Sequence, residues 1–89
     1  MKILEYCNCH PPIAYIHIGL WYAAIHGVTE NYVYLSEQIA RLPRYMKCTL
    51  FTDDKGKYFV VDSVRFYLDN AISPALYAWR RLHDNAVVA

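Results

Sequence analysis

The sequence has little of the material from which catalytic and cofactor sites are usually built. Its 89 residues include only three glycines, which is too few for a phosphate-binding loop. Neither a G-x-S-x-G elbow nor a His-Glu helix motif occurs. The adjacent acids Asp53 and Asp54 are better explained as turn residues than as a catalytic pair. We therefore expect no enzyme activity and no cofactor.

Cysteine is scarce and odd in number. Cys7, Cys9 and Cys48 do not form the even set of a disulfide framework, which predicts reduced thiols and a cytoplasmic location. The stretch CNCH places two of them beside His10, but structural zinc sites space paired cysteines by two to four residues. Because no second compact pair exists, we predict no metal site. The sequence leaves open whether the three cysteines ever bind metal.

A surplus of charge and a long hydrophobic run are also missing. The net charge is +1, far from the basic balance of most nucleic-acid-binding domains. The most apolar run, Ile13 to Ile25, is shorter than the roughly 20 residues of a membrane-spanning helix and contains His17. No signal peptide is recognisable at the N-terminus. We expect no membrane partner, and nucleic acid is the less favoured class of ligand.

Apolar and aromatic residues are abundant instead. The composition is 56% hydrophobic and 16% aromatic, with nine tyrosines, which favours a folded chain with one core spanning residues 1–89. A domain of this size has too little interior to bury nine tyrosines with their hydroxyl groups satisfied. Some tyrosines must therefore lie on the surface, where aromatic side chains are typical of protein interfaces.

Hydrophobic spacing and breaker residues predict an α+β fold, with helices packed on a short antiparallel β-hairpin and a third strand at the N-terminus. The predicted elements, in chain order, are a strand at 2–9, a helix from Pro11 or Pro12 to Gly27, a helix from Thr29 to Leu42, a hairpin of 47–51 with 57–61, a short helix from Ser63 to Leu68, and a helix that begins at Ser73-Pro74. In the hairpin, Phe51 is expected opposite Phe59, with Asp53 to Gly56 as the turn.

One stretch is similar to a helix-turn-helix motif. Ala23, Gly27 and Val33 fall at the positions of the small residue, the turn glycine and the apolar anchor of that motif. The resemblance covers residues 23–36 and implies a winged-helix or helix-turn-helix transcriptional regulator, with the later hairpin as its wing. Under this alternative the DNA-contacting residues are Asn31, Gln38, Arg41, Arg44 and Lys47.

The interpretation that we favour is a small non-catalytic protein-binding module. It fits an inhibitor or adaptor of a larger cellular complex, of the kind that phages and mobile elements encode, and self-association into a homodimer is a natural corollary. The residues expected to contact the protein partner are Tyr45, Tyr58, Tyr67, Tyr77, Trp79 and Arg80.

Overall fold

The computed structural model describes residues 2–19, 21–39 and 42–88, and of residues 38, 39 and 84–88 it describes the backbone alone. Within these ranges the chain consists mainly of β-strands, with a helix near each end. The elements are α1 (Ile3–Cys9), β1 (Ala14–Ile18), β2 (Trp21–Val28), β3 (Tyr32–Ile39), β4 (Leu42–Thr49), β5 (Phe51–Asp53), β6 (Gly56–Val61), β7 (Val64–Tyr67), the 3-10 helix η1 (Leu68–Asn70) and α2 (Pro74–Val88).

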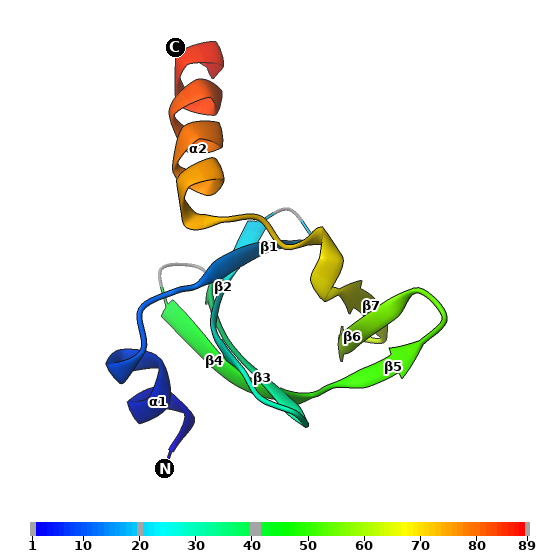
Figure 1. The fold of residues 1–89 in the computed structure, drawn as a ribbon. Coiled ribbons are helices and arrows are strands. Elements are labelled where there is room, and N and C mark those ends of the chain that lie inside the picture. The colour runs from blue at the N-terminus through cyan, green and yellow to red at the C-terminus, as the bar shows by residue number, and fades with distance from the viewer. Residues whose placement is uncertain (1, 20, 40–41, 89) are drawn as a thin grey trace.

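The strands form two antiparallel sheets that curve around one core (Figure 1). The first, sheet A, has the order β1-β2-β3-β4, and the second, sheet B, has the order β5-β6-β7. Only Leu50 separates β4 from β5, so the chain passes directly from one sheet into the other. After η1, two backbone hydrogen bonds between Tyr15 and Ile72 join the end of sheet B to β1. The result is an incomplete β-barrel, in which residues alternate between inside and outside.

That alternation defines the core. Inward-facing residues recur at every second position of β1, β2, β3 and β6, as strand geometry requires. They are Ile16, Ile18, Ala23, Ile25, Val33, Leu35, Phe59 and Val61. Phe59, the largest of them, is fully buried and brings the inner face of sheet B against that of sheet A.

Helix α1 covers the outer face of sheet A, where it packs on β2, β3 and β4. The Tyr6 ring stacks on Tyr34 and lies so close to Gly27 that a Cβ atom there would collide with it. His26 ties the end of the helix to the sheet: its Nδ1 donates to the His10 carbonyl at 2.7 Å, and its Nε2 lies 2.6 Å from the Ser36 hydroxyl. Gly27 is therefore the residue that allows α1 to dock.

The predicted arrangement of helices on a short hairpin is wrong. Residues 14–18 and 21–25, expected in a helix, instead lie in the paired strands β1 and β2, in which Ile16 lies opposite Ala23. Gly19, just after β1, has a φ of +61°. This run is apolar on nearly every side, so its spacing matched a helix without excluding strands. Its isoleucine, tyrosine and tryptophan residues favour strands, and Gly19 supplies the left-handed turn.

The predicted helix from Thr29 to Leu42, and with it the helix-turn-helix geometry, is also wrong. Residues 32–39 form β3, which pairs with β2 on one side and β4 on the other. Its Val33, Leu35 and Glu37 are buried at two-residue spacing, which is the period of a strand. Thr29 does not cap a helix, because its hydroxyl accepts a hydrogen bond from the Tyr32 N–H within a turn between strands.

Three smaller expectations also need correction. The N-terminal strand predicted at 2–9 is the helix α1, so the chain has no strand there. The predicted hairpin is only partly correct: residues 57–61 lie in β6, but β6 pairs with β5 and not with 47–51, because Lys47 to Thr49 belong to β4 of sheet A. Within the observed hairpin Phe51 pairs with Tyr58 instead of Phe59. Ser63 does not begin a helix, because Asp62 and Ser63 adopt left-handed conformations, with φ of 51° and 67°, in the turn before β7. Two successive positive φ values match the right-handed twist of a hairpin.

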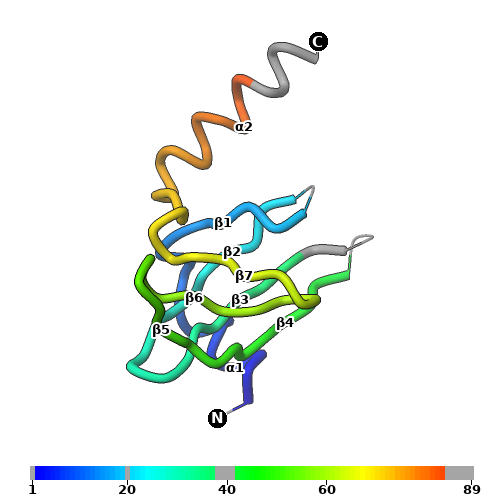
Figure 2. The backbone as a smooth tube through the Cα atoms, turned by 90° about the vertical axis from the view of Figure 1, so that its right-hand side faces the viewer, coloured from blue at the N-terminus to red at the C-terminus, as the bar shows by residue number. Residues whose placement is uncertain are grey.

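The start of the last helix was predicted correctly. Helix α2 begins at Pro74, and the Leu76 N–H donates to the Ser73 hydroxyl at 3.1 Å. Proline at the first position and serine before it are typical of helix N-termini. The helix extends away from the strands (Figure 2). Among the described helices, none is both long and apolar enough to cross a bilayer.

Candidate functional site

The residues predicted to bind a protein partner lie on three separate parts of the surface. Tyr58 and Tyr67 share the outer face of sheet B, where their rings are 5.3 Å apart. Tyr77, Trp79 and Arg80 belong to α2. The sixth residue, Tyr45, is half-buried on β4 opposite Ser36, on the face of sheet A that α1 partly covers. Two candidate surfaces remain, one on sheet B and one on α2.

The first surface is aromatic across all three strands of sheet B. Because Phe59 and Val61 point inward, their neighbours Tyr58 and Val60 point outward. Phe51 on β5, Tyr58 on β6 and Tyr67 on β7 lie in register, with ring centroids 5.5 and 5.3 Å apart. Phe51 is 47% exposed and Val60 40% exposed. We call this set, with Asp53 and Arg65, the sheet B face.

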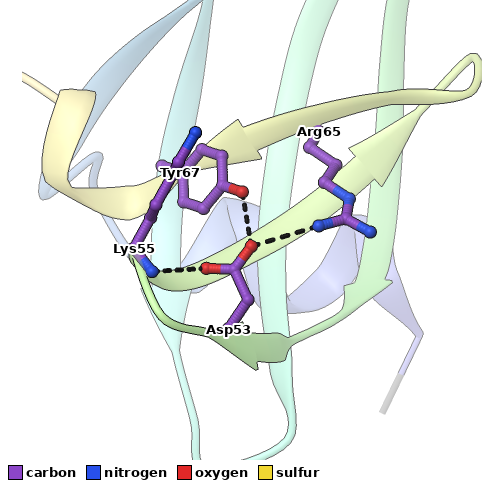
Figure 3. Close-up of polar contacts among 4 residues, drawn as sticks. All are labelled: Asp53, Lys55, Arg65 and Tyr67. Carbon is purple, nitrogen blue, oxygen red and sulfur yellow. Dashed lines mark hydrogen bonds and ion pairs between the residues drawn. The ribbon is translucent and has the colours of Figure 1, made fainter.

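Asp53 is the polar centre of the sheet B face (Figure 3). Its carboxylate accepts hydrogen bonds from the Tyr67 hydroxyl at 2.5 Å, the Lys55 backbone N–H at 2.8 Å and the Arg65 guanidinium at 3.1 Å. The Arg65 guanidinium also lies over the Tyr58 ring, 4.5 Å from its centroid. The Tyr67 hydrogen bond, aided by Lys55 and Arg65 and opposed by partial desolvation, lowers the pKa of Asp53 below its ordinary value. The carboxylate is therefore held ionised beside an arginine.

The second surface is formed by α2. On the side of the helix that faces the barrel, Tyr77 stacks on Tyr15 at 3.8 Å and meets Tyr22 edge-on at 5.3 Å. Arg80 donates to the Tyr22 hydroxyl at 3.1 Å, and Arg81 donates to the Tyr77 hydroxyl at 3.0 Å. The contacts of Tyr77 and Arg80 attach the first turns of the helix to the outside of the β1–β2 hairpin, whereas the Arg81 hydrogen bond lies within the helix.

On the other side of α2 lies an apolar ridge. Leu76, Trp79 and Leu82 follow one another at three-residue spacing, and they are 38%, 55% and 69% exposed. Residues at this spacing share one side of a helix. The Trp79 indole is stacked on His83 at 3.7 Å, which holds the ring along the helix surface. We call these three residues the α2 ridge.

The residues of the DNA-binding alternative are not brought together on a helix. Asn31 lies in the turn before β3, whereas Gln38 lies near the other end of that strand, about 23 Å along an eight-residue strand. Arg44 is paired with the buried Glu37 at 2.9 Å, and Lys47 lies over the Tyr32 ring at 4.1 Å. Arg41 falls outside the described residues. Two of the expected phosphate contacts are thus already engaged within the protein.

The cysteines and histidines do not form an obvious reactive site. Burial raises the pKa of the Cys7 thiol, whose Sγ lies 3.8 Å from the Leu35 carbonyl. Burial also raises the pKa of Cys48, although the charge of Arg44 opposes the shift. The His10 ring stacks on Tyr6, and its Nδ1 lies 2.8 Å from the Tyr6 carbonyl. Among the described residues, no three His, Cys, Asp or Glu side chains gather closely enough to hold a metal ion.

Sequence reasoning missed two thirds of the residues of each surface. Asp53 was interpreted as a turn residue only, and Phe51 was placed opposite the wrong partner, so the aromatic row of sheet B was not recognised. Leu76 and Leu82 were not among the residues expected to contact a partner. The alternation of Tyr58 and Val60 with Phe59 and Val61 was the signal that could have found the sheet B face.

Comparison with protein-family models, curated proteins and solved structures gave no significant match.

Proposed function

We propose that the protein is a non-catalytic protein-binding module that inserts the α2 ridge into an apolar groove of a larger partner. The observation that carries this proposal is the α2 ridge itself: three large apolar side chains exposed on a helix that is attached to the barrel by its opposite side. An amphipathic helix that lays one face into a groove is a common mode of peptide recognition. Trp79, at the centre of the ridge, is of the residue type most enriched at interface hot spots.

The energetics of α2 support a role as a ligand for another protein. A 15-residue helix is marginal in water unless packing stabilises it. Among the described side chains of the helix, packing on the barrel involves the first turns, through Tyr77 and its neighbours. A partner that covered the ridge would stabilise the helix while burying its apolar surface, because both changes occur in the same binding event.

The charges beside the α2 ridge indicate which side chains should line the groove of the partner. Residues 74–83 contain Arg80 and Arg81 and no acid, and Asp84 follows them. Both arginines are exposed, and each donates a hydrogen bond to a tyrosine hydroxyl group. We therefore expect acidic side chains on the rim of the partner's groove.

The role that we propose is that of an inhibitor or adaptor of a cellular complex, as in proteins of phages and mobile elements. We propose that the protein acts in the cytoplasm, where Cys7, Cys9 and Cys48 would stay reduced.

The test is affinity capture followed by binding measurements with the purified partner. The variant Trp79→Ala/Leu82→Ala removes the two most exposed ridge side chains and keeps strong helix propensity, since alanine is the best helix former. Binding should weaken by more than about 100-fold, because two central anchors of an interface are lost. The matched control is Val28→Ala, which shortens a comparably exposed apolar side chain on β2.

Circular dichroism must show that the double variant retains its fold before its binding is compared. If this folded variant binds the captured partner as tightly as the unmodified protein does, the α2 ridge is not the binding site. If Val28→Ala weakens binding to the same degree, the contact lies on the barrel.

A further inference from the structure

The sheet B face is a second surface that the α2 proposal leaves unused. The solvent side of an antiparallel sheet normally carries polar residues in alternation with the apolar core side. In sheet B, however, the outer side carries Phe51, Tyr58, Val60 and Tyr67. Among the described residues neither α-helix packs over this side, since α1 contacts β2, β3 and β4 and α2 contacts β1; η1 contacts β6, and its Leu68 packs against the core.

The charge of this face differs from that of α2. Residues 51–67 contain three acids and three bases. At the centre of the face, Asp53 and Arg65 form an ion pair of 3.1 Å, and the guanidinium lies over Tyr58. A surface that carries both signs side by side can be placed against a copy of itself without repulsion. Two copies of α2 would instead bring Arg80 and Arg81 of one chain close to those of the other.

We infer that the sheet B face is a homodimer interface, in which a second copy of this chain packs the same face across a two-fold axis. In such an isologous contact each residue meets the equivalent surface of its partner, so self-complementarity is required. The aromatic row of Phe51, Tyr58 and Tyr67 provides the apolar part of the contact. The Arg65 of each copy lies near the Asp53 of the other, which turns two ion pairs into one four-charge network. The α2 ridge stays free, so this dimer is independent of the proposed hetero-partner.

The test is sedimentation equilibrium of the full chain from about 1 μM to about 1 mM, where interfaces of modest size dissociate. The apparent mass should rise from 10.4 kDa towards twice that value. The variant Phe51→Thr/Val60→Thr removes the two most exposed apolar side chains of the face and places threonine, a β-branched residue that favours strands, at both positions. Its dimer dissociation constant should be at least about tenfold higher. The variant Trp79→Ala on α2 should dimerise like the unmodified chain.

A second measurement avoids substitutions altogether. In an NMR dilution series of the unmodified chain, the amide signals that shift between dimer and monomer should cluster on residues 51–53, 58–60 and 65–67. A chain that stays monomeric over the whole concentration range overturns the inference. So does a dimer whose shifting signals map to α2, or one that survives in the folded Phe51→Thr/Val60→Thr variant. A dimer retained by Trp79→Ala while hetero-partner binding is lost separates the two proposals.

Discussion

Helix α2 and the sheet B face both expose aromatic side chains, but they differ in how they are anchored and in how their charge is distributed. The sheet B face is the outer side of strands whose inner side contributes Phe59 and Val61 to the core. Helix α2 is held by aromatic stacking on the outside of β1 and β2. The difference shows that exposed aromatic side chains alone do not identify a partner. The way in which a surface is anchored determines how rigid it is, and its charge distribution determines whether it can bind a second copy of itself.

The largest effect should come from removing the anchor of sheet B. Phe59→Ala deletes a fully buried ring that stacks on Phe66, and we expect the free energy of unfolding to fall by about 3–5 kcal/mol. The matched control is Phe51→Ala, the same change on the outer side of the same sheet, which should cost much less. Urea denaturation at low protein concentration measures both. Equal losses for the two variants would mean that the two sides of sheet B are not distinguished as inside and outside.

A smaller effect is expected from detaching α2. Tyr77→Ala removes the stacking on Tyr15 and the edge contact with Tyr22, a loss of about 0.5–1.5 kcal/mol for an aromatic pair. Because the helix is appended to the barrel, its amides should exchange with solvent faster while those of the strands stay protected. Tyr77→Phe keeps the ring and should change the exchange much less. Faster exchange throughout the barrel would show that α2 is part of the core unit.

The smallest effect concerns the charge at the centre of the sheet B face. The hydrogen bond from Tyr67 is the main cause of the lowered pKa of Asp53, so Tyr67→Phe should raise that pKa towards its ordinary value. A carboxyl whose pKa is lowered in the folded protein adds stability above its unfolded pKa, about 3.9, and this stability is lost as the pH falls through the folded pKa. Tyr67→Phe should therefore reduce stability at neutral pH, and this part of the difference should vanish in strong acid.

NMR titration of the Asp53 carboxyl carbon measures the shift directly. Arg65→Gln should raise the same pKa as well, because the charge and the hydrogen bond of the arginine also lower it. An unchanged Asp53 pKa in Tyr67→Phe would contradict the role assigned to the hydroxyl group.

Local signals predicted some elements and missed the architecture. Ser73-Pro74 carries a cap and a helix-starting proline in two residues, and α2 begins there. The turn near Asp54 was also predicted, because turn residues act locally. Spacing failed where apolar residues occupy both sides of an element: residues 13–25 match helical and strand periods alike, and only pairing between β1 and β2 decides between them. The fold class depends on such long-range pairing, so it could not be predicted from this sequence.

The candidate sites, like the fold, could be predicted only in part from local sequence signals. The chemistry of the partner-binding residues was predictable, since surface tyrosine and tryptophan follow from a small core. Their grouping was not predictable, because a one-residue change in hairpin register moves Tyr58 from one side of the sheet to the other. The observed register pairs Phe51 with Tyr58 and Tyr58 with Tyr67, and that pairing turns separate aromatics into one surface.

The bridge between Tyr15 and Ile72 has a consequence for the order of folding. It joins residues near opposite ends of the chain, and contacts at such large sequence separation carry a high loop-closure entropy and form slowly. Because α2 starts two residues after Ile72, we expect its stacking on the β1–β2 hairpin to form together with this closure. In a newly made chain, α2 would therefore reach its position against the barrel only once the barrel is complete. A correctly placed α2 would then indicate that the whole fold has formed.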